Sequence, residues 1–146
     1  MVEGGRIDHA CHANDAVTTI QDTLAFDDAV QEAIAFYTKH SNDTLLIITG
    51  DHKTGGLTLG FAGTHYESAF NTLSGQKISY EKYGENEFAQ YKKTHTSSTC
   101  TLSDLREELS SLFGLDHLNT QEPQQLTDAL KRSCAGKVMQ GNAESD

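Results

Sequence analysis

Side chains that can bind divalent metal ions gather near the start of the chain. Glu3, Asp8 and His12 lie close together on a segment loosened by Gly4 and Gly5. Three residues separate Asp8 from His12, so one helical turn would place both side chains on the same face. Carboxylate and imidazole groups are typical zinc ligands, whereas a glutamate with no imidazole nearby suits a harder ion such as magnesium.

A second group of metal ligands follows a β-rich run of residues. Residues 44–49 lead through Gly50 to the adjacent pair Asp51 and His52. Beside the end of a strand, two adjacent side chains diverge unless the backbone bends between them. Taken together, the two groups suggest a site for more than one metal ion.

The elements that must position these groups are predicted to form a βαβ unit. Met1 and Val2 have the character of a strand end, and residues 44–49 resemble a strand buried on both faces of a parallel sheet. Between them, apolar residues recur with helical spacing and predict a helix over about residues 23–39. This order predicts an α/β fold with a partial, doubly wound and mostly parallel sheet. Ligands of such sheets bind beyond the carboxyl ends of the strands, where both groups of metal ligands are expected.

Helical patterns dominate the later part of the chain. Apolar spacing predicts one helix over about residues 79–93. A second is predicted from Leu102 to Leu112, with Thr101 as its cap and Gly114 at its end. A third is predicted to start at Thr120 as its cap, with Pro123 in its first turn. The small polar residues from Gly136 onward predict a frayed tail. We therefore expect three parts: an α/β core with the metal ligands over residues 1–60, a helical insertion over residues 61–135, and a flexible tail over residues 136–146.

The charge of the chain argues against two classes of partner. Its 146 residues include 21 acidic and 11 basic side chains, for a formal net charge of −10. Nucleic acid and anionic membrane surfaces are negatively charged, so neither is expected as a partner. An acidic protein that handles phosphate needs local cations, which bound metal ions supply. The cysteines, Cys11, Cys100 and Cys134, are widely spaced and leave one unpaired if two join.

Three spaced motifs resemble the alkaline phosphatase family. They are Val2-Glu3-Gly4-Gly5-x-Ile7-Asp8 with His12-Ala13-Asn14, then Phe26-Asp27-x-Ala29-Val30, then Thr49-Gly50-Asp51-His52-x-Thr54-Gly55-Gly56-Leu57. The resemblance covers about residues 1–60 and is specific, because several motifs appear in the family's order. Residues 61–135 resemble more faintly the helical insertion that some bacterial members carry.

The resemblance implies a role for each metal-ligand candidate. Glu3 matches the family's magnesium ligand, Asp8 and His12 match two ligands of one catalytic zinc ion, and Asp51 and His52 match ligands of the other. His9 is compatible with a variable position that often contacts phosphate.

The resemblance also implies a reaction and its setting. The implied cofactors are zinc and magnesium, and the implied reaction is hydrolysis of a phosphate monoester through a phosphoserine. Family members are usually periplasmic or secreted, and a homodimer of the full-length enzyme is compatible with the family.

The chain also departs from the family pattern. The family's serine nucleophile, its phosphate-binding arginine and the aspartate shared between metals belong to an earlier part of the protein. No catalytic residue is therefore assigned, and we expect this chain to be the carboxyl-terminal part of a catalytic domain, inactive by itself. The remaining histidine ligand normally lies in a His-Thr-Gly motif, whereas His95-Thr96 continues into Ser97 and stays unassigned. Lys53 stands where glutamate is common.

Each candidate has another interpretation when it is taken alone. Asp8 and His12 could be a pair on a helix surface, His52 a buried histidine bonded to the backbone, and Glu3 a solvated side chain. Their joint order and spacing favour the metal site. Two other functions stay open: a phosphodiesterase or phosphomutase of the same superfamily, and a non-catalytic metal-binding module.

Overall fold

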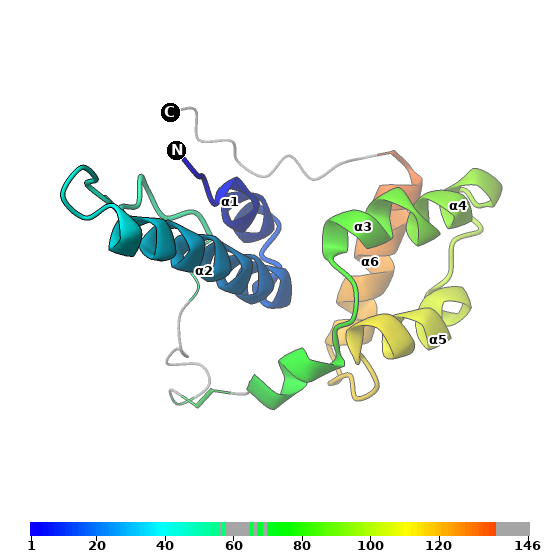
Figure 1. The fold of residues 1–146 in the computed structure, drawn as a ribbon. Helices are drawn as coiled ribbons and strands as arrows, with labels where there is room; N and C mark the ends of the chain where they lie inside the picture. Colours follow the sequence, from blue (N-terminus) through cyan, green and yellow to red (C-terminus); the bar gives the residue numbers. More distant parts are fainter. Residues whose placement is uncertain (56, 58–64, 66, 69, 137–146) are drawn as a thin grey trace. The chain divides into compact units, whose positions relative to one another are not determined.

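The computed structural model describes residues 1–55, 57, 65, 67–68 and 70–136 (Figure 1). These residues form helices and contain no strand. The helices are α1 (Gly5–His12), α2 (Ala16–Lys39), the 3-10 helix η2 (Phe70–Gly75), α3 (Tyr80–Glu85), α4 (Glu87–Thr94), α5 (Leu102–Phe113) and α6 (Glu122–Cys134). The chain divides into two compact units, Met1–Leu73 and Ser74–Asp146. Apart from Gly136, the predicted tail lies outside the described residues.

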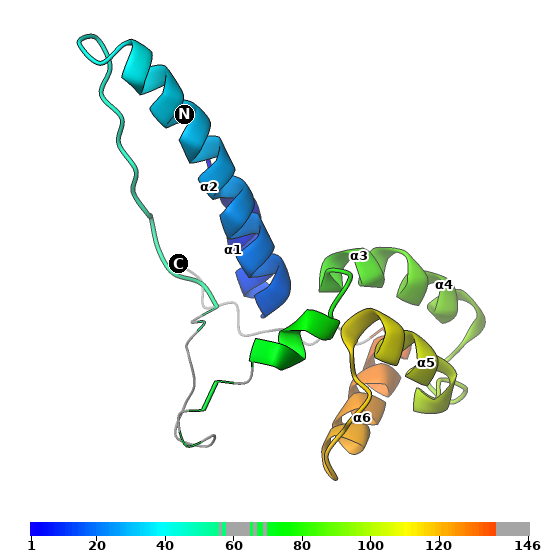
Figure 2. The same cartoon turned by 60° about the horizontal axis from the view of Figure 1, so that its bottom comes forward.

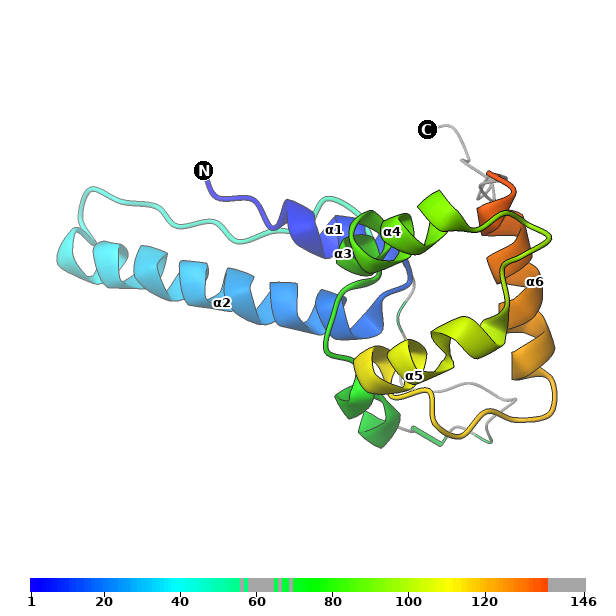
Figure 3. The same cartoon turned by 90° about the vertical axis from the view of Figure 1, so that its right-hand side faces the viewer.

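The predicted parallel sheet is wrong for the described part of the chain. After α2, residues 44–50 run back alongside that helix without forming a strand (Figures 2 and 3). Leu45, Ile47 and Ile48 are therefore exposed, at 82%, 72% and 59% of their full accessibility. A β-rich sequence favours an extended backbone, but a sheet also needs a second extended segment to share its ladder of hydrogen bonds. No described residues provide that segment, and residues 1–2 are likewise not in a strand.

In the first unit, α1 packs against α2. Asn14 has a left-handed backbone (φ 53°) and lies in the short turn between the two helices. The carboxylate of buried Asp15 caps α2 by accepting a hydrogen bond from the Thr18 N–H at 3.1 Å. The helix predicted over residues 23–39 is thus confirmed, but it begins earlier, at Ala16, because its cap lies upstream of the apolar stripe.

In the second unit, the helix predicted over residues 79–93 is divided into α3 and α4. Asn86 lies between them with φ −107° and ψ −87°, outside the helical region. Ser79 caps α3, because its hydroxyl accepts a hydrogen bond from the Lys82 N–H at 3.1 Å. The apolar spacing therefore predicts the helical content correctly but misses the interruption.

The helix expected after Thr101 is confirmed as α5. The Thr101 hydroxyl accepts a hydrogen bond from the Asp104 N–H, and Gly114 ends the helix in a left-handed conformation (φ 67°). The Leu115 N–H then returns to the Leu109 carbonyl at 3.4 Å. Both ends of α5 are therefore fixed by residues that the sequence identifies.

The side chain that caps the start of α6 lies one residue before the predicted one. The side-chain oxygen of Asn119, and not Thr120, accepts hydrogen bonds from the N–H groups of Gln121 and Glu122 at 2.8 Å and 3.0 Å. Pro123 occupies the first turn, as predicted.

The core of the second unit forms around a disulfide. Cys100, Leu105 and Leu130 make a buried cluster, and the surrounding partly buried residues are Phe88, Tyr91, Leu109 and Cys134. The bond between Cys100 and Cys134 joins the segment before α5 to the last residue of α6. Among the described residues, no helix combines the length and the apolar character that crossing a bilayer requires.

Candidate metal centre

The first ligand pair, Asp8 with His12, lies on one face of α1. Asp8 Oδ2 is 3.5 Å from His12 Nε2, across one helical turn. The His12 side chain is 69% exposed and that of Asp8 is 36% exposed, so both can reach a bound ion. The helix begins at Gly5 and ends at His12, so it includes both residues. The helix therefore supplies the shared face that the spacing suggested.

The second ligand pair, Asp51 with His52, lies on the segment that follows α2. The backbone bends so that these adjacent side chains converge, with Asp51 Oδ2 3.5 Å from His52 Nε2. The His52 N–H also donates to Asp51 Oδ1 at 2.9 Å. This hydrogen bond is the main reason that the pKa of Asp51 is lowered; the Asp51 backbone N–H and the charge on the His52 ring add to the effect. Asp51 is therefore held as a carboxylate, the form that binds metal ions.

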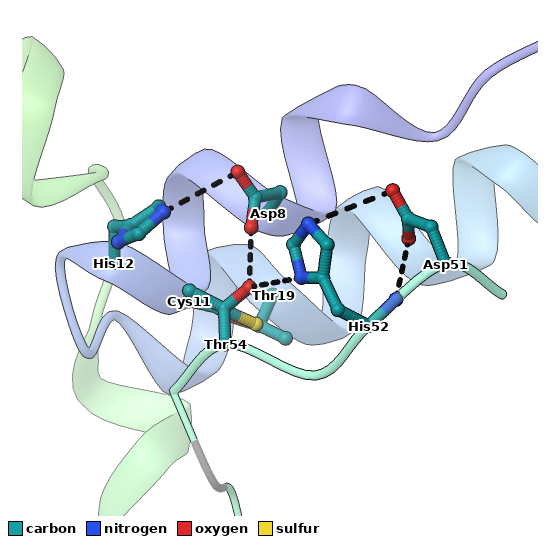
Figure 4. Close-up of polar contacts among 7 residues, drawn as sticks. All are labelled: Asp8, Cys11, His12, Thr19, Asp51, His52 and Thr54. Carbon is teal, nitrogen blue, oxygen red and sulfur yellow. Dashed lines mark hydrogen bonds and ion pairs between the residues drawn. The ribbon is translucent and has the colours of Figure 1, made fainter. Parts of the chain in front are cut away.

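Thr54 connects the two ligand pairs (Figure 4). Its hydroxyl donates a hydrogen bond to Asp8 Oδ1 and lies 3.3 Å from His52 Nδ1. The close-up shows the segment of Asp51, His52 and Thr54 passing beside α1, with the Thr54 side chain directed toward Asp8. The structure thus links the two pairs of predicted metal ligands through Thr54, which lies 46 residues from Asp8 in the sequence.

Gly55 allows the segment to approach α1 this closely. A Cβ atom at position 55 would lie 2.6 Å from the carbonyl oxygen of Cys11, a distance that real Cβ atoms do not reach. Only glycine fits there without moving the backbone of α1 or of the segment. Thr54 and Gly55 belong to the Thr-Gly-Gly motif that the sequence presents, but their roles depend on contacts with α1 that spacing alone does not reveal.

Glu3 and His9 lie apart from these contacts. Both residues are exposed, and neither takes part in the interactions of Figure 4. Within the described ranges, no three histidine, cysteine, aspartate or glutamate residues are grouped tightly enough to hold a metal ion. The structure therefore forms two separate pairs of ligands, while the magnesium and phosphate roles of Glu3 and His9 stay predictions.

The spacing within each pair fits a zinc ion. Ligand atoms bind zinc at about 2.0 to 2.2 Å in a tetrahedron, which places neighbouring ligand atoms roughly 3.4 Å apart. The two oxygen–nitrogen distances, 3.5 Å in both pairs, match this value. Each pair could therefore supply two of the three or four protein ligands that a zinc site normally uses.

Similarities to known proteins agree with the sequence motifs. A family model described as alkaline phosphatase matches residues 1–118. Repressible alkaline phosphatase of Saccharomyces cerevisiae is 49% identical over 57 residues, which cover 39% of this chain and 10% of that protein. Alkaline phosphatase 4 of Bacillus subtilis is 43% identical over 77 residues, covering 53% of this chain and 16% of that protein.

The alignment to a third relative extends further along the chain. Alkaline phosphatase of Escherichia coli is 31% identical over 126 residues, covering 79% of this chain and 24% of that protein. No solved structure matches the chain significantly. This chain thus spans between a tenth and a quarter of the length of the three relatives.

Proposed function

This chain belongs to the alkaline phosphatase family, and from that premise we propose that it supplies metal ligands for the hydrolysis of phosphate monoesters. Asp8 and His12 would hold one zinc ion, and Asp51 and His52 would hold a second. The observation that supports this proposal is the convergence of two carboxylate–imidazole pairs, each with a 3.5 Å spacing, around the Thr54 hydroxyl.

The carboxylates at the site explain why the chain would use metal ions to handle phosphate. With a net charge of −10, the chain repels a phosphate dianion unless positive charge is held nearby. Two bound dications would supply that charge and stabilise the oxygens that enter and leave the phosphorus atom. The chain's own part is to hold the ions through Asp8, His12, Asp51 and His52, with Glu3 proposed as a magnesium ligand and His9 as a contact to phosphate.

We assign the serine nucleophile of the proposed phosphoserine to no residue of this chain. The 146-residue chain by itself is therefore expected to be inactive, because the metal ligands stabilise a displacement but do not provide the attacking group. Purified chain should not hydrolyse a generic aryl phosphate in the presence of zinc. Appreciable turnover that disappears in an Asp51→Asn variant would overturn this part of the proposal.

Calorimetric zinc titration of the chain tests the ligand assignment. We expect two weak binding events, since each pair is one or two ligands short of a complete zinc site. Asp8→Asn should remove one event and Asp51→Asn the other, whereas Asp43→Asn, in the exposed turn after α2, should change neither. Zinc binding that is the same in all three variants would contradict the assignment. Tight stoichiometric binding by the chain alone would favour a metal-binding module instead.

We propose a periplasmic or secreted location for the protein. The Cys100–Cys134 disulfide supports this proposal, because disulfides persist in oxidising compartments and are rare in the cytosol. Alkylation of free thiols before cell lysis, followed by mass spectrometry, tests the proposal. The expected result is alkylation of Cys11 with protection of the other two cysteines, and alkylation of all three would argue against it.

A further inference from the structure

The turn that follows α2 carries the acceptor pattern for an N-linked oligosaccharide. Asn42-Asp43-Thr44 consists of an asparagine, a residue other than proline, and then a threonine. Enzymes that attach N-linked oligosaccharides modify the asparagine of this pattern in surface loops of secreted proteins. No other asparagine of the sequence has a serine or threonine two residues after it. The pattern therefore identifies a single position.

The backbone places this position at the surface of the first unit. The Asp43 N–H donates a hydrogen bond to the His40 carbonyl at 3.1 Å, which closes a turn with Asn42 as its third residue. Ser41, Asn42 and Asp43 are all exposed. The turn connects the end of α2 to the segment that runs back beside this helix (Figures 2 and 3). The asparagine side chain is therefore accessible to an enzyme.

The fold does not use the Asn42 side chain. Asn119 shows what a structural asparagine does in this chain, because its side-chain oxygen accepts two hydrogen bonds at the start of α6. Within the part of the chain that the structure describes, no hydrogen bond holds the Asn42 carboxamide or the Thr44 hydroxyl. Both groups that define the acceptor pattern are thus available to the transferring enzyme.

The turn also lies far from the first ligand pair. Cys11 of α1 lies beside Thr19 of α2, with 3.7 Å between its sulfur and the threonine hydroxyl oxygen. About 20 residues of helix, or roughly 30 Å, separate Thr19 from the end of α2. A bulky group on Asn42 would therefore leave the Asp8 and His12 side chains accessible.

We propose that Asn42 accepts an N-linked oligosaccharide. The carboxamide nitrogen of Asn42 bonds to the anomeric carbon of an oligosaccharide that is carried on a polyprenyl diphosphate. The bond between that carbon and the diphosphate oxygen breaks, the polyprenyl diphosphate leaves with the electron pair, and the amide releases one proton. The proposal rests on the proposed periplasmic or secreted location, because N-linked oligosaccharides are found on secreted proteins.

Secretion of the chain from a eukaryotic cell line tests the acceptor site. The 146-residue chain, directed into the secretory pathway by an added signal sequence, should carry one oligosaccharide that peptide N-glycosidase removes. This enzyme converts the modified asparagine to aspartate, so peptide mass mapping identifies the position. Asn42→Gln and Thr44→Ala should abolish the modification. Thr44→Ser should retain it, because serine keeps the hydroxyl that the pattern requires.

Ser41→Ala is the matched control. Ser41 is exposed in the same turn but lies outside the acceptor pattern, so this variant should be modified like the wild type. Substitutions in an exposed turn change stability little, so each variant should still be secreted. The proposal is overturned if the secreted wild-type chain carries no oligosaccharide on Asn42, or if the modification persists in Thr44→Ala.

Thiol alkylation in cells of the natural source separates this inference from the proposed location. If Asn42 of the directed chain is modified but all three cysteines are alkylated in the source cells, the acceptor site is supported and the location is refuted. If Cys100 and Cys134 are protected in the source cells but Asn42 of the directed chain stays unmodified, the acceptor site alone is refuted.

Discussion

The Tyr83 hydroxyl and one carboxylate oxygen of Glu108 are buried in the second unit without a hydrogen-bond partner among the described residues. The Tyr83 ring stacks on Phe88 and meets Phe113 edge-on, with centroids 5.8 Å and 5.1 Å apart. Burial raises the pKa of Tyr83 to about 12, and the negative charge of Glu108 adds to the effect. Burial likewise raises the pKa of Glu108, with a smaller contribution from Glu87. Folding therefore disfavours ionisation of both Tyr83 and Glu108.

Replacing Glu108 with glutamine should stabilise the protein at neutral pH. Because the folded-state pKa of Glu108 is raised, its favourable contribution is complete below the unfolded value of about 4.3 and is lost as the pH rises through the folded value. Glu108→Gln removes the ionised form and should raise the free energy of unfolding at pH 7 by about 0.5 kcal/mol, a small gain because solvent screens a group that is only partly buried. Urea unfolding at several pH values measures the difference.

The control is Glu107→Gln, a neighbouring and exposed position on the same helix. It removes the same charge from α5 without relieving a buried group, so it should change stability little. The prediction for Glu108 is contradicted if both variants have the same effect, or if the gain from Glu108→Gln is as large near pH 4 as at neutral pH.

Single residues of the candidate metal centre were predictable where chemistry and short-range spacing suffice. The spacing of Asp8 and His12 indicates a shared helix face, and the structure forms it. For Asp51 and His52, sequence shows only that they are adjacent, and the bend that makes them converge belongs to the folded segment. The link through Thr54 spans 46 residues, so no local pattern predicts it.

Among the elements, those with local end signals were predicted best. Thr101 and Gly114 define α5 by contacts within one turn of the helix, so the sequence locates both ends correctly. Residues 44–50 show the opposite case, since their β-rich composition favours extended backbone but pairing depends on a segment elsewhere in the chain. The predicted sheet depends on this pairing, and the prediction is wrong for the described residues.

A glycine comparison tests how α5 is terminated. Gly114 has φ 67°, and a Cβ there would lie 2.7 Å from the Cα of Gly75. Gly114→Ala should therefore lower the free energy of unfolding by about 2 kcal/mol or more, since the left-handed backbone alone costs alanine roughly 1 to 2 kcal/mol. Gly84 in α3 is the matched control, because a Cβ there would meet no atom within 4 Å.

Gly84→Ala should instead raise stability by about 0.5 to 1 kcal/mol, the usual preference for alanine over glycine within a helix. Thermal and urea unfolding of the two variants decide between these outcomes. If Gly114→Ala is tolerated as well as Gly84→Ala, neither the left-handed turn nor the close contact with Gly75 constrains the end of α5.

The two units of the molecule differ in how much they bury. In the first unit, the buried residues among those described are Ala10, Asp15 and Thr19, whereas Leu24 and Phe36 are 55% and 56% exposed. The second unit has an apolar cluster closed by a disulfide. The candidate metal centre therefore lies in the unit with the smaller core. A bound ion would there contribute a larger share of the unit's free energy of unfolding, because few buried contacts contribute to it otherwise.

Native-state hydrogen exchange should reveal this difference between the units. Amides of α5 and α6 should exchange slowest, and amides of α1 and α2 faster, because few apolar contacts stabilise the first unit and it should open more often.

The Cys100–Cys134 bond closes a loop of 34 residues, for which chain entropy predicts a stabilisation of about 3 to 4 kcal/mol. Cys134→Ser should reduce the protection of α5 and α6 by an amount of this order and leave that of α1 and α2 unchanged. Cys11→Ser, which removes the unpaired cysteine, should not alter the second unit. Equal protection of all four helices in the wild type, or a loss in Cys134→Ser that spreads evenly through both units, would mean that the chain unfolds as a single cooperative body.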